Sequence, residues 1–450
     1  MAAATAIAKY GICCRRSFSS LKFHLNFNQF HKSFTPSLSL TPQFFHHSIS
    51  TLQQKPSSHS KKKKRNKTEN QNPKNVIAKT LAEESRLKRR TRSEKKFDQD
   101  VIRQYGDDVN HVPVMLGEVL DVFSAVNLRS FVDCTVGAAG HSVAIIQAHP
   151  EMQLYVGLDV DPIAHEKAQV RINSFLHGES CHRTYDLKMY TLLKNFKDFR
   201  SVLEEVDERS LTPGVNGILM DLGMSSMQVN NAERGFSVLA DGPLDMRMDP
   251  KASLKAEDIL NFWPDTEVGR ILRDYGEESN WYNLQNKIVK ARASGGLHST
   301  VELVDLIRKS APSTRGGRHG WIKTATRVFQ ALRIAVNDEL NTLKTSLYSC
   351  FDCLSPGGRL AVISFHSLED RIVKQTFLDI IGEKSEDEVS TDKMQCRLES
   401  LNSSEGAWVK QIIPGQNGKI LTKRPITPSQ EEEKLNRRCR SAKLRVIQKV

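Results

Sequence analysis

The stretch from Phe131 to Ser142 constrains the fold of this chain more than any other. It reads F-V-D-C-T-V-G-A-A-G-H-S, an apolar run that ends in an acid and a small-residue turn, and an apolar helical pattern follows it. This order predicts a strand, a tight turn and a helix. Gly137 and Gly140 permit a turn that a Cβ atom would resist, and they let a ligand approach the N–H groups at the start of the helix.

A second predicted strand follows at once and also ends in an acid. Residues Leu154 to Leu158 are apolar, Asp159 comes next, and Pro162 stands in the first turn of the next predicted helix. A carboxylate at the tip of this strand, 22 residues after Gly137, accepts hydrogen bonds from both hydroxyls of a ribose. Together with Asp133, the unit predicts a site for an adenosine-like ligand. It does not choose between a nicotinamide dinucleotide and S-adenosylmethionine (SAM).

Two further predicted strands end in polar residues. Ile218 to Asp221 leads into the loop L-G-M-S-S-M-Q, and Arg359 to Phe365 is followed by His366. In a doubly wound sheet, ligands bind beyond the carboxyl ends of the strands, so Asp221 and His366 are expected at one crevice. A capped turn at Asp221 and Ser225, or a hydrogen-bonded structural histidine, would explain the same residues without chemistry.

The elements between these strands are less sharply marked. A weak third strand is expected around His182 to Asp186, with Tyr190 just beyond it, where an aromatic ring can cover an adenine or simply pack in the core. Helices are predicted from Thr191 to Val206 and from Thr324 to about Cys350.

A run of helical patterns without a strand predicts an inserted helical domain at residues 237–322. Its segments are Leu254 to Phe262, Thr266 to Tyr275, Trp281 to Ala293, and one opened by the capping box Ser299-x-x-Glu302. Exposed arginines and aromatic residues make this domain a candidate for RNA binding, although a solvated helix face is the alternative. The residues in question are Arg270, Arg273, Trp281, Arg292 and the basic glycine loop Ser313 to Trp321.

The basic charge of the chain belongs to its first part. Residues 1–110 hold 22 Lys and Arg against 8 Asp and Glu, whereas the rest holds 43 against 44. The net charge of +13 is therefore no general argument for nucleic acid binding. Residues 1–60 lack Asp and Glu altogether, which is typical of an organelle transit peptide, and residues 61–109 are expected to be a disordered basic linker. A merely disordered tail is the alternative.

Other features of the composition narrow the class of protein. No apolar run approaches the roughly 18 residues of a membrane span, so no membrane partner is predicted. The eight cysteines form no paired framework, and Cys350-x-x-Cys353 lacks a second ligand pair, so we predict a reducing compartment and no metal site. Residues 382–407 are expected to be a mobile insertion. Residues 419–450 hold ten Lys or Arg and three Glu, which favours a phosphate-binding surface.

The motifs, taken together and in order, resemble the bacterial RsmH (MraW) family. The resemblance covers about residues 110–450, and it rests on D-C-T-V-G-A-A-G-H-S, L-D-V-D-P, D-L-G-M-S-S, D-G-P-L-D-M-R-M-D, S-F-H-S-L-E-D-R-I-V-K and R-S-A-K-L-R-V. Members are SAM-dependent methyltransferases that modify the N4 amine of a cytosine at the decoding site of small-subunit ribosomal RNA. The leader adds the expectation of a plant organelle member.

The resemblance also implies site residues. It places SAM contacts at Ala139, Gly140, His141, Asp159, Tyr190, Asp221 and Gln228, to which the turn adds Asp133 and Gly137. Asp221, Ser225 and His366 are the candidate catalytic residues, because the cytosine amine needs a hydrogen-bond acceptor as its nitrogen attacks the methyl group. The chain departs from the family pattern at Ala138-Ala139, where a Gly is usual, and at Met227, which replaces a common Pro.

The predicted fold is an α/β doubly wound, Rossmann-like methyltransferase sheet, built from residues 110–236 and 323–450, with the helical insertion between them. The partner is small-subunit ribosomal RNA or the assembled small subunit, a homodimer stays open, and the destination is the chloroplast or, as the alternative, the mitochondrion. Two other functions stay open: an RNA-binding assembly factor that has lost turnover, and a dinucleotide-dependent oxidoreductase.

Overall fold

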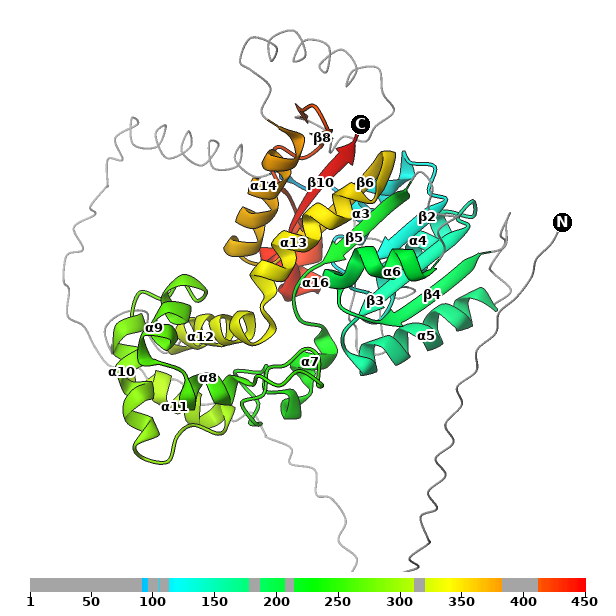
Figure 1. Ribbon diagram of the computed structural model, residues 1–450. Helices are drawn as coiled ribbons and strands as arrows, with labels where there is room; N and C mark the ends of the chain where they lie inside the picture. The colour runs from blue at the N-terminus through cyan, green and yellow to red at the C-terminus, as the bar shows by residue number, and fades with distance from the viewer. Residues whose placement is uncertain are drawn as a thin grey trace, which may run out of the picture. The chain divides into compact units, whose positions relative to one another are not determined.

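The structure is a computed structural model that describes most of the chain beyond residue 112 (Figure 1). The described residues are 91–95, 105, 113–177, 187–206, 214–310, 320–382 and 412–450. The predicted transit peptide lies outside these ranges, as do nearly all of the basic linker, the predicted mobile insertion and the basic glycine loop. Among the described residues, no helix combines the length and the apolar character needed to cross a bilayer.

One sheet forms the centre of the described part of the chain. Its main strands, in spatial order, are β4 (Lys188–Leu193), β3 (Leu154–Asp159), β2 (Ser130–Asp133), β5 (Val215–Asp221), β6 (Leu354–Ser364), β10 (Lys443–Lys449), β9 (Ile426–Thr427) and β1 (Thr91–Arg92). The strands from β4 to β6 are parallel, and β10 runs antiparallel to β6. Strand order reverses at β2, so the predicted doubly wound topology is confirmed, with its switch point between β2 and β5.

Helices cover both faces of this sheet (Figure 1). The pleat sends Phe131 and Val132 of β2 to two different cores, because successive strand residues point to opposite faces. One core includes α3 (Leu116–Ser124), α4 (Gly140–Ala148) and α5 (Pro162–Leu176). The other includes α6 (Phe199–Val206), α13 (Glu339–Asp352) and α14 (Ser367–Ile381). With both faces covered, the carboxyl ends of the parallel strands are the expected place for a ligand.

The inserted helices have a hydrophobic core of their own. They are α8 (Ala256–Phe262), α9 (Asp265–Asp274), α10 (Trp281–Arg292), α11 (Thr300–Ser310) and α12 (Gly320–Asn337). The predicted capping box opens α11: Ser299 Oγ accepts from Glu302 N over 3.3 Å, and Glu302 Oε2 accepts from Ser299 N over 3.1 Å. Since α12 packs into this core, the helical part extends to Asn337 and not only to residue 322.

Three elements differ from the prediction. The third strand is β4, so residues 191–193 are strand, and the predicted helix begins only at Phe199, after the 3-10 helix η1 (Phe196–Asp198). The predicted site of that strand, His182 to Asp186, lies outside the described residues. The single helix predicted from Thr324 to Cys350 is instead two, because Asp338 adopts a left-handed backbone with φ 46°. Asp is one of the few residues that tolerate this conformation.

The basic C-terminal segment is part of the sheet and not a free tail. It contains the hairpin β7 (Ile413–Pro414) and β8 (Gly418–Ile420), then β9, α16 (Gln430–Leu435), the 3-10 helix η4 (Arg437–Ser441) and β10. Leu444 and Val446 of β10 are buried in the core beside β6. Lys443 and Arg445, which alternate with them, made this strand look like a basic tail, but both pair with Asp370 of α14.

Candidate cofactor and catalytic site

The turn after β2 is fixed by Asp133, which is buried at the end of the strand. Its Oδ2 accepts from Ser142 Oγ over 2.6 Å, and its Oδ1 accepts from Thr135 N over 3.0 Å. Burial raises the pKa of Asp133 to about 6. The predicted cofactor residue therefore ties the strand to α4, and both of its oxygens already have partners in the protein.

The altered glycine turn keeps the backbone that a glycine would adopt. Ala139, the N-cap of α4, has φ 59°, and Gly137 has φ 54°. The Ala139 methyl group is fully buried, whereas a Cβ at Gly140 would overlap Pro113 Cγ and lie 2.9 Å from Tyr105 O. Ala139 has no side-chain oxygen that could cap α4, so a ligand can approach the N–H groups at the start of this helix.

Asp159 stands at the tip of β3, beside this turn. Its Oδ2 accepts from Gly137 N over 2.9 Å, and its Oδ1 accepts from Asp161 N over 2.9 Å. Each carboxylate oxygen has a second lone pair for a hydroxyl donor. Burial raises the pKa of Asp159. The predicted ribose acceptor is thus held at the glycine turn by two backbone donors.

A buried hydrogen-bond network around Asp161, which sequence reasoning missed, supports this edge of the sheet. Asp161 caps α5 and accepts at its Oδ2 from Gln228 Nε2 over 3.0 Å and from Arg234 Nη1 over 2.7 Å. Arg234 also donates to the carbonyl oxygens of Arg247 and Met248. The local signals were the helix-start pair D-P and the motif E-R-G-F, but neither shows that the two meet.

Ser225 and Gln228 form the capping box of α7 (Ser226–Asn230). Ser225 Oγ accepts from Gln228 N over 3.2 Å, and Gln228 Oε1 accepts from Ser225 N over 3.0 Å. The structure therefore gives Ser225 the capping role that was the alternative to catalysis. Gln228 is buried, and its amide is used by the cap and by Asp161.

Asp221, at the end of β5, has a carboxylate oxygen that can still accept a hydrogen bond. Its backbone N–H donates to Thr135 Oγ1 over 2.7 Å, and its Oδ1 is buried without a hydrogen-bond partner among the described residues. Its Oδ2 lies 3.7 Å from His141 Nδ1. Burial, followed by the negative charges of Asp133 and Glu369, raises the pKa of Asp221 well above its ordinary range. Such an acid marks a site where a ligand supplies the missing partner.

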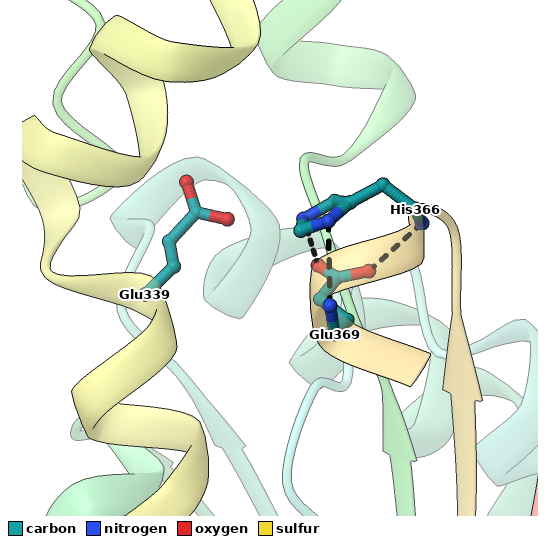
Figure 2. Close-up of side chains that lie close together, drawn as sticks. All are labelled: Glu339, His366 and Glu369. Carbon is teal, nitrogen blue, oxygen red and sulfur yellow. Dashed lines mark hydrogen bonds and ion pairs between the residues drawn. The ribbon is translucent and has the colours of Figure 1, made fainter. Parts of the chain in front are cut away.

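His366 lies in a charged cluster with Glu339 and Glu369 (Figure 2). It caps α14, with its Nδ1 3.4 Å from Glu369 N and its Nε2 3.0 Å from Glu369 Oε1. Glu369 also accepts from Phe365 N over 2.8 Å. Burial acts to raise the pKa of Glu369, but the hydrogen bond and charge of His366 outweigh it, and the pKa is lowered.

The geometry of this cluster favours an internal ion network over a metal centre. Donor atoms of Glu339, His366 and Glu369 lie within 4.8 Å of one another. However, Arg333 already binds both carboxylate oxygens of Glu339, each over 2.9 Å. A metal ion would have to displace this buried guanidinium. His366 thus lies directly after β6, where it caps α14, and its catalytic role stays a prediction.

Tyr190 lies inside β4 and not beyond it. Its Cα pairs with Val156, whereas Leu193 is the residue opposite Asp159, and its side chain packs against the core under α6. The aromatic residue that follows the strand is Phe196 of η1. The cofactor role of Tyr190 stays a prediction, and Phe196 occupies the place in the chain that was predicted for it.

The fold and the site define a doubly wound α/β protein that binds an adenosine-type cofactor at the carboxyl edge of its sheet. The residues fit SAM, because Asp159 offers lone pairs to a ribose and Asp221 has an unpartnered oxygen. Residues 108–450 match the model of the MraW methylase family, and the chain belongs to this family. It is therefore a methyltransferase with SAM as its cofactor, which removes the oxidoreductase alternative.

Comparison with individual proteins agrees with this family assignment. The chain is 40% identical over 343 residues to the Ribosomal RNA small subunit methyltransferase H of Heliobacterium mobile, covering 76% of this chain and 100% of that protein. It is 42% identical to the protein of that name from Heliobacterium modesticaldum, over 76% and 99%. A Streptococcus mutans structure solved with SAH matches with 11% identity over 75% and 99% of the two chains; its TM-score of 0.29 is too low to support an argument.

Proposed function

We propose that this chain transfers the methyl group of SAM to the N4 amine of a cytosine in the small-subunit ribosomal RNA of an organelle, with the chloroplast as its destination. The names of its relatives support a small-subunit ribosomal RNA substrate. The acid-free residues 1–60 support import, and the mitochondrion is the alternative.

The observation that carries the chemistry is the unpartnered Oδ1 of Asp221. A cytosine amine is a weak nucleophile because its lone pair is delocalised into the ring. An acceptor that takes a hydrogen bond from this amine builds electron density on the nitrogen as it attacks. When bound, SAM supplies an electrophilic methyl group, and its positive charge favours the ionised form of Asp221.

The other residues of the site position the reactants. Asp159 holds the sugar of the cofactor, and the Asp161, Gln228 and Arg234 network holds the loop that follows Asp221. The target base must leave its stack to reach this buried carboxyl, because a paired amine is shielded. The altered glycine turn gives no reason to expect lost turnover, since Ala139 adopts the required backbone.

The test uses the full chain, SAM and small subunits from a bacterial strain that lacks the modification. Mass analysis of the ribosomal RNA nucleosides is expected to show N4-methylcytidine with the wild-type protein, and none with an Asp221→Ala variant. Methylation at another atom, or none with a protein that binds SAM, would reject the proposal. A fusion of residues 1–110 to a fluorescent protein tests the destination separately.

A further inference from the structure

The 3-10 helix η4 carries three exposed arginines in five residues: Arg437, Arg438 and Arg440. Cys439, which is fully buried, fixes this turn to the core. Residues three apart in a 3-10 helix lie on the same side, so Arg437 and Arg440 project together. The turn therefore holds its arginines in fixed positions on the surface, as a flexible tail would not.

These arginines have no carboxylate partner within 4.0 Å in the described part of the chain. Nearby cations of the same segment do: Lys443 and Arg445 pair with Asp370 over 2.9 and 2.7 Å. A guanidinium stays charged at any physiological pH and offers five donors in a plane. The charge at η4 is thus available to an external anion.

The position of η4 links this charge to the catalytic edge. Arg438 Nη1 donates to Ser226 Oγ over 2.6 Å, and its Nη2 donates to Asn230 Oδ1 over 3.0 Å. Both partners belong to α7, which begins directly after the loop from Asp221 to Ser225. Arg438 therefore ties η4, and with it Arg437 and Arg440, to the helix that follows the proposed catalytic loop.

The arginines predicted to bind RNA on the helical insertion are in a different state. Arg270 pairs with Glu267 over 2.8 Å, Arg273 with Asp274 over 2.7 Å, and Arg292 with Asp265 over 2.8 Å. Arg292 also donates to two backbone carbonyl oxygens. Each of these arginines already pairs with a carboxylate of the protein. They should therefore attract a polyanion less strongly than the arginines of η4 do.

We propose that Arg437 and Arg440, mounted beside α7 by Arg438, form the edge that contacts backbone phosphates of the RNA next to the target cytosine. This inference rests on the proposed function and names the surface that holds its substrate. Guanidinium groups suit phosphates because they bind them bidentately. Phosphate contacts of this kind strengthen RNA binding and fix the position of the RNA on the protein. The base is then selected by contacts at the catalytic site.

The experiment compares two double variants of the full chain that lose the same charge. The test variant is R437A/R440A, and the control is R270A/R273A, whose arginines are ion-paired. Binding of a fluorescent small-subunit RNA fragment is measured by anisotropy at several salt concentrations. For R437A/R440A the Kd for the RNA is expected to rise about tenfold. The slope of log Kd against log salt concentration should fall by between about one and two, because RNA binding releases fewer counterions when two phosphate contacts are missing. The Kd for SAM should not change.

The control is expected to bind the RNA within about twofold of wild type. Equal RNA affinity and salt slope for R437A/R440A and wild type would overturn the inference, as would an equal loss in the control. Circular dichroism and SAM binding show whether each variant is folded. Wild-type protein that binds this RNA through η4 but does not methylate it would reject the proposed function alone, so the two failures are distinguishable.

Discussion

His141 Nδ1 lies 3.7 Å from Asp221 Oδ2, while Nε2 of the same imidazole lies 2.9 Å from Val114 O. A carbonyl oxygen only accepts, so Nε2 carries the hydrogen in the neutral ring and Nδ1 turns a lone pair toward Asp221. A separation of 3.7 Å is too long for a hydrogen bond. The neutral imidazole therefore lies beside Asp221 Oδ2 without a hydrogen bond to it, and Oδ1, which has no hydrogen-bond partner among the described residues, can accept from a ligand.

Replacing Asp221 by Asn tests this assignment. The amide keeps the shape of the side chain but cannot become negatively charged, so it is a weaker acceptor for the cytosine amine. The kcat for RNA methylation is therefore expected to fall about 10²–10³-fold. The matched variant is Ser225→Ala, which removes the cap of α7 and should cost about 1 kcal/mol of stability with kcat little changed. Rapid-quench assays and urea unfolding give the two quantities. An inactive Ser225→Ala enzyme beside an active Asp221→Asn enzyme would show that the hydroxyl, not the carboxyl, serves the amine.

Exchanging Gly and Ala at adjacent positions in the glycine turn should change stability by different amounts. Gly140→Ala forces a Cβ against Pro113 and Tyr105, and the overlap is expected to destabilise the fold by about 1–3 kcal/mol. Ala139→Gly relieves a left-handed backbone but loses a buried methyl group and adds chain entropy, so its net effect should stay within about 1 kcal/mol. Urea unfolding of both variants measures the difference. A strong loss for Ala139→Gly would mean that the methyl group, not the backbone, defines this turn.

The parts of the fold that sequence reasoning found are those with a local cause. The unit around Gly137 and Asp159 was predictable, because an apolar run, an acid and a glycine turn each leave their mark within a few residues. The capping box at Ser299 was predictable for the same reason. In each case one short segment fixes its own hydrogen bonds, and the structure shows those bonds.

The parts that it missed depend on contacts between distant segments. Asp161 meets Gln228 and Arg234 across 67 and 73 positions, and no local pattern announces such a meeting. Strand β10 alternates charged and apolar residues and resembles a basic tail until Asp370 is known to lie beside Lys443 and Arg445. For Ser225 the sequence left a catalytic role and a capped turn open, and the structure shows the cap with Gln228.

Phe196 and Tyr190 can be separated by SAM binding. Phe196→Leu keeps an apolar side chain but removes the ring face, so the Kd for SAM is expected to rise roughly tenfold if this ring covers the adenine. Tyr190→Leu removes the other ring face, at a position that packs inside β4, and should not change the Kd for SAM. Isothermal titration measures both. Loss of affinity in Tyr190→Leu, with none in Phe196→Leu, would instead support the prediction that was made for Tyr190.

Glu432 makes stability depend on pH. It is buried, its Oε1 accepts from Met115 N over 2.7 Å, and burial, followed by the charge of Glu118, raises its pKa from 4.5 to about 7. A folded-state pKa above the unfolded one means that the native state holds the proton more tightly. At low pH Glu432 is protonated and does not destabilise the fold. The free energy of unfolding falls as the pH rises from 4.5 to about 7, because the buried carboxyl then ionises.

Glu432→Gln should remove this loss, because the amide oxygen can still accept from Met115 N and carries no charge. The variant is expected to gain stability over wild type between pH 5 and pH 8, by at most about 3 kcal/mol for the full shift. Glu433→Gln is the control, since Glu433 forms a partly exposed pair with Arg92 that contributes under about 1 kcal/mol. Urea unfolding at both pH values isolates the effect, because all other groups titrate alike in the two proteins. Parallel pH profiles for wild type and Glu432→Gln would show that Glu432 ionises at its ordinary pKa in the folded chain.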